Sequence, residues 1–201
     1  MTKAELAARL KNACQSVMAA EGELTEIDSK FGDADHGITM SRIAGAIQGA
    51  VEESQGSIKA MLDDAAMAVM MINGGSAVPL WNTWLDGLQE AAPDREEMSA
   101  GEIKAMFAHA CESLSALSKA KVGDKTMMDA LIPASEAIAA AAEDEDAIFA
   151  AAAQAAVQGA ENSRSFVSKF GRARSYGEAT IGTPDAGAVS MSYFFAGLAK
   201  K

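Results

Sequence analysis

Three aspartates lie close together in the stretch IDSKFGDADHG, residues 27–37. Carboxylates as near to one another as those of Asp28, Asp33 and Asp35 repel unless a cation lies among them. Magnesium in proteins typically takes one or two carboxylates together with the phosphates of a substrate. The alternative is an acidic surface turn, in which glycines supply backbone freedom and water screens the charges. The spacing therefore makes these aspartates candidate ligands of a hard divalent cation.

A calcium loop of the EF-hand type does not fit this stretch. With Asp33 as the first ligand, the position that requires glycine holds Ile38 and the last ligand position holds Ala44. We therefore expect a second group to supply further ligands to the cation. The phosphates of a nucleotide fit that requirement.

Four predicted helices begin directly after glycine-bearing loops. The glycines concerned are Gly37, the pair Gly74-Gly75, Gly123 and Gly187. Exposed N–H groups and the helix dipole favour anions such as phosphates at helix starts. Alternate helices of an antiparallel bundle begin at the same end, so these four loops would form one rim beside the aspartates.

Apolar residues at helical spacing dominate the chain, and the alternation typical of strands is almost absent. Thr2 with Glu5 and Ser99 with Glu102 form capping-box patterns, which mark helix starts. We predict an all-α fold, namely an eight-helix antiparallel up-and-down barrel or bundle with a nucleotide site at one end. The expected helices span residues 3–20, 36–54, 57–72, 78–91, 100–119, 126–142, 145–166 and 186–199.

Composition narrows the class of protein. The 201 residues are 49% hydrophobic and show no repeat or linker, so we expect a single domain over residues 1–201. The net charge of −11 disfavours a nucleic-acid partner. No apolar run reaches transmembrane length and the N-terminus is charged from the start, so we expect a cytoplasmic protein that does not bind membranes.

Three blocks of the sequence carry a resemblance to a known family. The blocks LTEIDSKFGDADHGITMSR (24–42), GDKTMMDALIPA (123–134) and GRARSYGEATIGTPDAGA (171–188) resemble signatures of the ADP-binding L subunits of dihydroxyacetone kinases, the DhaL family. The similarity extends over essentially the whole chain in the same order. The family fold is an eight-helix antiparallel barrel with the nucleotide at one end, in agreement with the helix pattern and the expected rim.

The resemblance implies roles for the matching residues. Asp28, Asp33 and Asp35 match the aspartates that hold two magnesium ions bridging the nucleotide phosphates. Met127 matches a residue near the adenine, and Arg172 belongs to a segment that closes over the nucleotide. The complete set matched to the nucleotide is His36, Gly37, Ile38, Thr39, Gly74, Gly75, Ser76, Ala77, Gly123, Met127, Arg172, Asp185, Ala186 and Gly187. No catalytic residue beyond this metal and phosphate clamp is implied.

The chain departs from the family pattern in two loops. Val78 stands where the family usually has glycine, and the loop hydroxyl is moved to Ser76. In the tail, proline precedes Asp185 instead of following it, which leaves Ala186 in its place. These are the positions at which we expect the loop geometry to differ from the family.

The resemblance implies a kinase subunit that binds ADP or ATP with magnesium. It would pass the γ-phosphoryl group to dihydroxyacetone, or a related short ketose, held by a separate K subunit, and a phosphotransferase-system protein would rephosphorylate the bound ADP. A transcriptional regulator and a second copy of the chain in a homodimer are further implied partners. Two alternatives stay open: a regulatory module that binds the nucleotide without turnover, and an ATP-driven kinase subunit for a four-carbon ketose.

Overall fold

The computed structural model describes residues 1–200, which fold into nine α-helices and two short 3-10 segments. The α-helices are α1 (Lys3–Ala19), α2 (Glu21–Ser29), α3 (His36–Glu53), α4 (Ile58–Met70), α5 (Ala77–Ala91), α6 (Ala100–Ser118), α7 (Met128–Ala140), α8 (Glu145–Asn162) and α9 (Ala186–Leu198). The 3-10 segments are η1 (Ser163–Ser165) and η2 (Arg172–Thr180). Residues 1–200 contain no β-strand, so the prediction of an all-α fold is confirmed.

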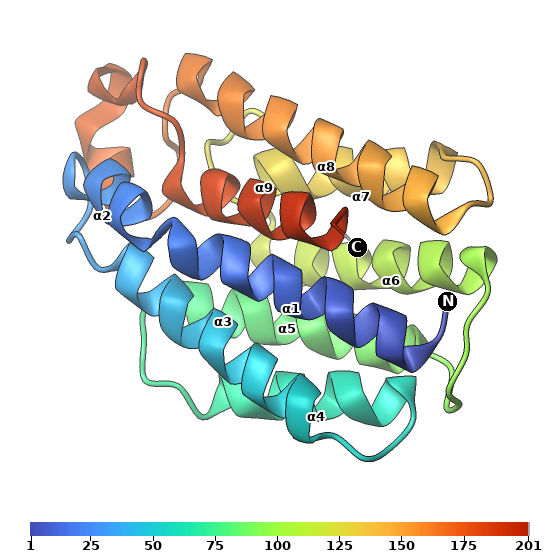
Figure 1. Ribbon diagram of the computed structural model, residues 1–201. Coiled ribbons are helices and arrows are strands. Elements are labelled where there is room, and N and C mark those ends of the chain that lie inside the picture. The colour runs from blue at the N-terminus through green and yellow to red at the C-terminus, as the bar shows by residue number, and fades with distance from the viewer. Residues whose placement is uncertain (201) are drawn as a thin grey trace.

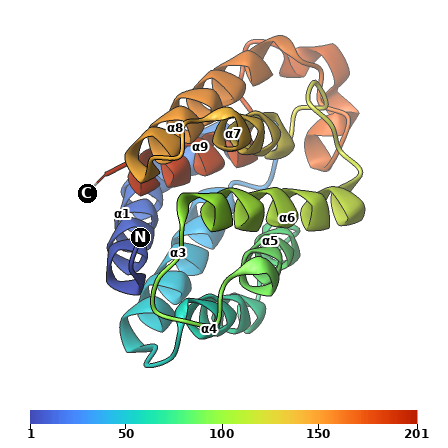
Figure 2. The same cartoon turned by 90° about the vertical axis from the view of Figure 1, so that its right-hand side faces the viewer.

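Eight of these helices form a closed ring. From α3 to α9 each helix packs against the next one in the chain, and α1 packs against both α3 and α9 (Figures 1 and 2). Because the ring closes, each helix buries flanks against two neighbours as well as its inner face. No helix within residues 1–200 is long and apolar enough to cross a membrane.

The helix α2 is an addition to the eight that the sequence predicts. It follows α1 after a bend at Ala20 and packs against α3 and α9 at one end of the ring (Figure 1). Only Leu24 of its residues is buried. A helix this short and polar has no apolar period, which is why the sequence pattern did not reveal it.

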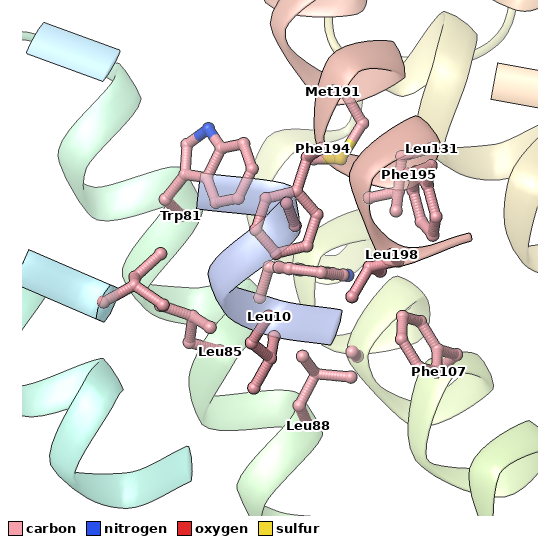
Figure 3. Packing of buried hydrophobic residues seen from close by; sticks show 14 of the residues in the cluster. Leu10, Trp81, Leu85, Leu88, Phe107, Leu131, Met191, Phe194, Phe195 and Leu198 are labelled. Carbon is pink, nitrogen blue, oxygen red and sulfur yellow. The ribbon is translucent and has the colours of Figure 1, made fainter. Parts of the chain in front are cut away.

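Aromatic side chains fill the centre of the ring. Trp84 of α5 contacts Phe194 of α9 edge to face, with ring centroids 5.5 Å apart and an interplanar angle of 86°. Trp81 meets the same Phe194 ring at 5.1 Å. Figure 3 shows Trp81 and Phe194 converging with leucines of α1 and α5 and with Phe107 of α6. Trp81 and Trp84 therefore belong to the core.

The ring closes where α1 meets α9. A Cβ atom at Gly197 would collide with the backbone of Ala13, so the two helices approach as closely as a glycine allows. Nearby, the buried Arg9 donates a hydrogen bond of 2.9 Å to the Leu198 carbonyl, and its guanidinium lies 4.9 Å from the centroid of the Phe149 ring. Arg9 thus ties α1 to α8 and α9.

The helices α3, α5, α7 and α9 all begin at the end of the ring that carries α2, at the left of Figure 1. We call this end the rim. Its four loops are the first rim loop (30–35), the second (71–76), the third (119–127) and the fourth (163–185). Both predicted capping boxes are present at helix starts, with Thr2 bonded to Glu5 and Ser99 bonded to Glu102.

Candidate metal and phosphate site

The three aspartates converge where α2 ends and the first rim loop begins. One carboxylate oxygen from each of Asp28, Asp33 and Asp35 lies within 4.8 Å of the other two. Asp28 is near the end of α2, whereas the other two belong to the loop itself. Three carboxylate oxygens at this spacing fit the hard oxygen ligands that magnesium takes.

Asp28 also shapes the first rim loop. Its Oδ2 atom accepts backbone N–H bonds from Asp35 at 3.2 Å and from His36 at 3.4 Å. Asp35 occupies the N-cap position of α3 but makes no capping bond with its side chain. Ala34, between the two loop aspartates, has a φ of 60°, a left-handed conformation that costs about 1–2 kcal/mol for a residue other than glycine. Such strain is common at functional sites.

The aspartate cluster holds more negative charge than the protein neutralises. Partial desolvation raises the pKa of Asp35, and the neighbouring charges of Asp33 and Asp28 raise it further, while the charge of Arg172 lowers it only in part. Arg172 is the guanidinium that forms an ion pair with Asp33. A divalent cation among the three carboxylates would offset the remaining repulsion.

The segment η2 of the fourth rim loop lies against the first rim loop. Arg172 at its start pairs with Asp33, and Tyr176 meets Phe31 edge to face with ring centroids 5.2 Å apart. The two contacts bring together segments about 140 residues apart in the chain, at the side of the aspartates.

His36 links the starts of two helices. Its Nε2 atom lies 3.1 Å from Ser190 Oγ on α9, and that hydroxyl donates to the Gly187 carbonyl at 3.0 Å. Burial lowers the pKa of His36, so the imidazole is neutral at pH 7. The His36 imidazole therefore fixes the start of α9 against the start of α3.

The second rim loop lies beside the first turn of α3. A Cβ atom at Gly74 would come within 3.2 Å of Thr39 Cγ2 and within 2.7 Å of Val78 Cγ2. Val78, which stands where the family usually has glycine, is buried, and its side chain occupies the space beside Gly74. Ser76 stands at the N-cap position of α5 without a side-chain bond, and Ala77 begins that helix.

The residues in the first turn of α3 differ from one another in solvent exposure. Gly37 is buried against α2, where a Cβ atom would collide with the Glu21 carbonyl and with Thr25. Thr39 is buried as well, whereas Ile38 is 42% exposed at the rim. Gly75 in the neighbouring loop has open space around it.

The third and fourth rim loops meet at the start of α9. A Cβ atom at Gly187 would lie 3.3 Å from the backbone nitrogen of Met127. Gly123, with a φ of 95°, donates its N–H to Asp129 at 2.5 Å. Asp185 caps α9 by accepting the Ala188 N–H at 2.8 Å, and Ala186 is the first residue of that helix. Together with the Arg172–Asp33 ion pair and the bond from Lys125 to the Ser163 carbonyl, these contacts join the first, third and fourth rim loops.

Burial raises the pKa of Asp185 to about 6. The unfolded chain loses this proton at a lower pH than the folded chain does. The free energy of unfolding therefore falls as the pH rises from about 4 to about 6. An asparagine side chain at this position would keep the helix cap without the charge. We expect Asp185→Asn to stabilise the chain by about 2 kcal/mol at neutral pH, and about 1 kcal/mol less near pH 5. Urea unfolding at the two pH values measures the difference, and a gain that is equal at both would contradict the assignment.

Sequence reasoning did not find Ser190, Phe31 or Tyr176. Ser190 lies one helical turn after Gly187, but the sequence offers no sign that a histidine 154 positions earlier contacts it. Phe31 and Tyr176 lie in loops, where apolar periodicity gives no information on partners.

Comparisons with known proteins identify the family of this chain. The model of the DAK2 domain family matches residues 30–200. The ADP-binding subunit DhaL of a PEP-dependent dihydroxyacetone kinase 2 from Listeria innocua is 31% identical over 172 residues, which cover 83% of this chain and 80% of the relative. The chain therefore belongs to the DAK2 domain family and is of the DhaL type.

Other relatives are either similar in length or much longer. The DhaL subunit of the Escherichia coli PEP-dependent dihydroxyacetone kinase is 29% identical, covering 92% of this chain and 91% of the relative. An L-erythrulose kinase from Pectobacterium atrosepticum is 37% identical over 93% of this chain, but the chain spans only 33% of that relative. The dihydroxyacetone kinase of C. freundii, solved with AMP-PNP and Mg2+, has the same fold with a TM-score of 0.77 at 22% identity, covering 98% of this chain and 33% of that chain.

Proposed function

We propose that the chain is the nucleotide-binding subunit of a short-ketose kinase. It holds ADP or ATP with magnesium at the rim and passes the γ-phosphoryl group to dihydroxyacetone, or a related ketose, bound by a separate K-type subunit. The observation that carries this proposal is the convergence of Asp28, Asp33 and Asp35 beside helix starts whose loops contact one another. The names of the E. coli and Listeria relatives as ADP-binding subunits support it.

Asp28, Asp33 and Asp35 are the residues that would hold magnesium, two ions in this proposal. When bound, magnesium supplies charge neutralisation at the phosphates. The starts of α3 and α5 offer backbone N–H groups to the phosphates. Arg172 adds a positive charge at the same side. Phosphoryl transfer depends mainly on positioning and charge, so no covalent nucleophile is needed in this chain.

The residues proposed for the nucleotide follow the same division of the rim. His36, Gly37, Ile38 and Thr39 are assigned to the phosphates with the second rim loop residues Gly74, Gly75, Ser76 and Ala77. Gly123, Met127, Asp185, Ala186 and Gly187 are assigned to the adenosine side, where the third and fourth rim loops meet.

The ketose has two candidates. Two erythrulose kinases are 37% and 35% identical to this chain, against 31% and 29% for two DhaL subunits of dihydroxyacetone kinases. The higher identity to the erythrulose kinases makes a four-carbon ketose a candidate substrate beside dihydroxyacetone. The sugar-binding residues would lie on the K-type partner, so the partner determines the choice.

The phosphoryl donor also has two candidates. The DhaL relatives of similar length are named PEP-dependent, which favours a phosphotransferase-system protein that rephosphorylates ADP in place. Free ATP is the alternative. A transcriptional regulator and a second copy of the chain in a homodimer are the further partners in this proposal, and the cytoplasm is its location.

Native mass spectrometry of the purified chain tests the nucleotide site, and we expect one ADP bound with magnesium. Transfer is then assayed with dihydroxyacetone and with erythrulose, with and without a K-type subunit. We expect no transfer by the chain alone and transfer when the subunit is added. Robust transfer by the chain alone would contradict the subunit assignment, and bound ADP without transfer to any partner would favour a regulatory module.

A further inference from the structure

Lys125 is a buried lysine for which the proposed phosphoryl transfer has no use. The residue is 4% exposed and lies in the third rim loop with a φ of 59°. A buried ammonium is costly unless its N–H groups are hydrogen-bonded. Burial lowers the pKa of Lys125, and the charges of Asp185 and Asp129 oppose that change. The hydrogen-bond partners of the ammonium therefore indicate the role of Lys125.

Every N–H group of the Lys125 ammonium has a backbone partner in the fourth rim loop. Nζ donates to the carbonyls of Ser163 at 2.7 Å, Phe166 at 3.2 Å and Thr183 at 2.6 Å. An ammonium has three donors, so its capacity is filled. Ser163 and Phe166 open the fourth rim loop, whereas Thr183 is close to its end. One side chain of the third rim loop thus joins both ends of the fourth.

Two neutral bonds and one charge-assisted bond lie beside this contact. The charge-assisted bond is that of the exposed Arg164 guanidinium, which donates to the Gly182 carbonyl at 3.2 Å. Ser163 Oγ accepts the Asp185 N–H at 2.8 Å, and the Arg164 carbonyl accepts the Gly182 N–H at 2.8 Å. The loop between these bonds carries Arg172, which reaches Asp33 of the first rim loop. Charge-assisted bonds are stronger than neutral ones. The buried Lys125 ammonium makes three such bonds, against one from the exposed Arg164, and is therefore the principal contact that fixes where the fourth rim loop starts and ends.

We propose that Lys125 is a positioning residue of the nucleotide site. By holding both ends of the fourth rim loop, it sets Arg172 against the aspartates of the first rim loop and Asp185 at the start of α9 beside Met127. This inference rests on the proposed function only for its affinity measurement. The conformation of the loop is testable without any nucleotide.

Lys125→Met removes the ammonium and keeps a side chain of similar length. We expect the dissociation constant of ADP with magnesium to rise about tenfold or more. We also expect trypsin, without nucleotide, to cleave after Lys169, Arg172 and Arg174 about tenfold faster or more, while circular dichroism remains helical. Lys121→Met is the matched control, because Lys121 is an exposed lysine of the same loop, and neither quantity should change.

A second comparison separates positioning from general stability. Ile103 is fully buried in the first turn of α6, at the end of the ring away from the rim, so Ile103→Ala destabilises the chain without touching the loops. If Ile103→Ala matches Lys125→Met in both the cleavage rate and the ADP affinity, Lys125 is only structural and the proposal is overturned. A larger change in Lys125→Met supports it.

Two further outcomes keep the test decisive. If the parent chain binds no ADP, the proposed function fails, but the trypsin comparison still decides the role of Lys125. If Lys125→Met does not fold, Lys125→Gln, which keeps two N–H donors, is judged by the same two measurements against Ile103→Ala. Parent-like values in a folded Lys125→Gln chain would overturn the proposal.

Discussion

Asp35→Asn is expected to abolish magnesium-dependent ADP binding while slightly stabilising the chain. The amide removes one anionic oxygen from the set that would hold magnesium, and we expect the dissociation constant of ADP with magnesium to rise about 1,000-fold, or about 4 kcal/mol. Without magnesium the same change relieves the repulsion that helps to raise the pKa of Asp35. The residue is exposed, so this gain is limited to a few tenths of a kcal/mol, about 1 °C in Tm.

Isothermal titration with ADP and magnesium measures the first effect, and thermal unfolding without either ligand measures the second. Asp64→Asn is the control, because Asp64 is an exposed aspartate on α4 outside the cluster. It should change neither quantity. An Asp35→Asn chain whose ADP affinity stays within about threefold of the parent would remove Asp35 from the metal site.

Gly37→Ala is expected to weaken both the fold and the site. The new Cβ atom would collide with the Glu21 carbonyl and with Thr25, so α2 must move away from α3. Overpacking of this kind costs about 1–3 kcal/mol. Because α2 carries Asp28, we also expect ADP affinity with magnesium to fall by about 10-fold to 100-fold. Urea unfolding and isothermal titration measure the two losses.

Gly45→Ala is the matched control on the same helix. A Cβ atom at Gly45 meets nothing within 4 Å, so alanine there should raise stability by about 1 kcal/mol through its helix propensity. ADP affinity should stay unchanged. If Gly37→Ala behaves like Gly45→Ala, the close packing of α2 on α3 does not support the site.

The sequence predicted most of the fold because apolar periodicity and capping residues are local signals. Thr2 and Ser99 marked helix starts that the structure confirms. The helix α2 and the segment η2 escaped prediction because they are short, polar and largely exposed. Such elements form because the rest of the ring holds them, and that information is not local.

The candidate site was predictable in part for the same reason. The close spacing of Asp28, Asp33 and Asp35 indicated their cluster, and the order of helices indicated a shared rim. The partners across the rim were not predictable, since the pairing of Lys125 with the Thr183 carbonyl depends on how two loops meet in space. Val78 shows the same limit: the sequence predicted altered loop geometry there, and the structure shows a buried side chain beside Gly74.

The junction of α1 with α9 has a consequence for how the protein is made. Arg9 and Leu198, which are hydrogen-bonded at that junction, are 189 positions apart. Contacts between such distant residues form late, because the loss of chain entropy must come first. A growing chain therefore exposes the inner face of α1 until α9 has left the ribosome. The fourth rim loop and the start of α9 also emerge after the other rim elements, so nascent chains should neither close the ring nor capture nucleotide before α9 has been synthesised.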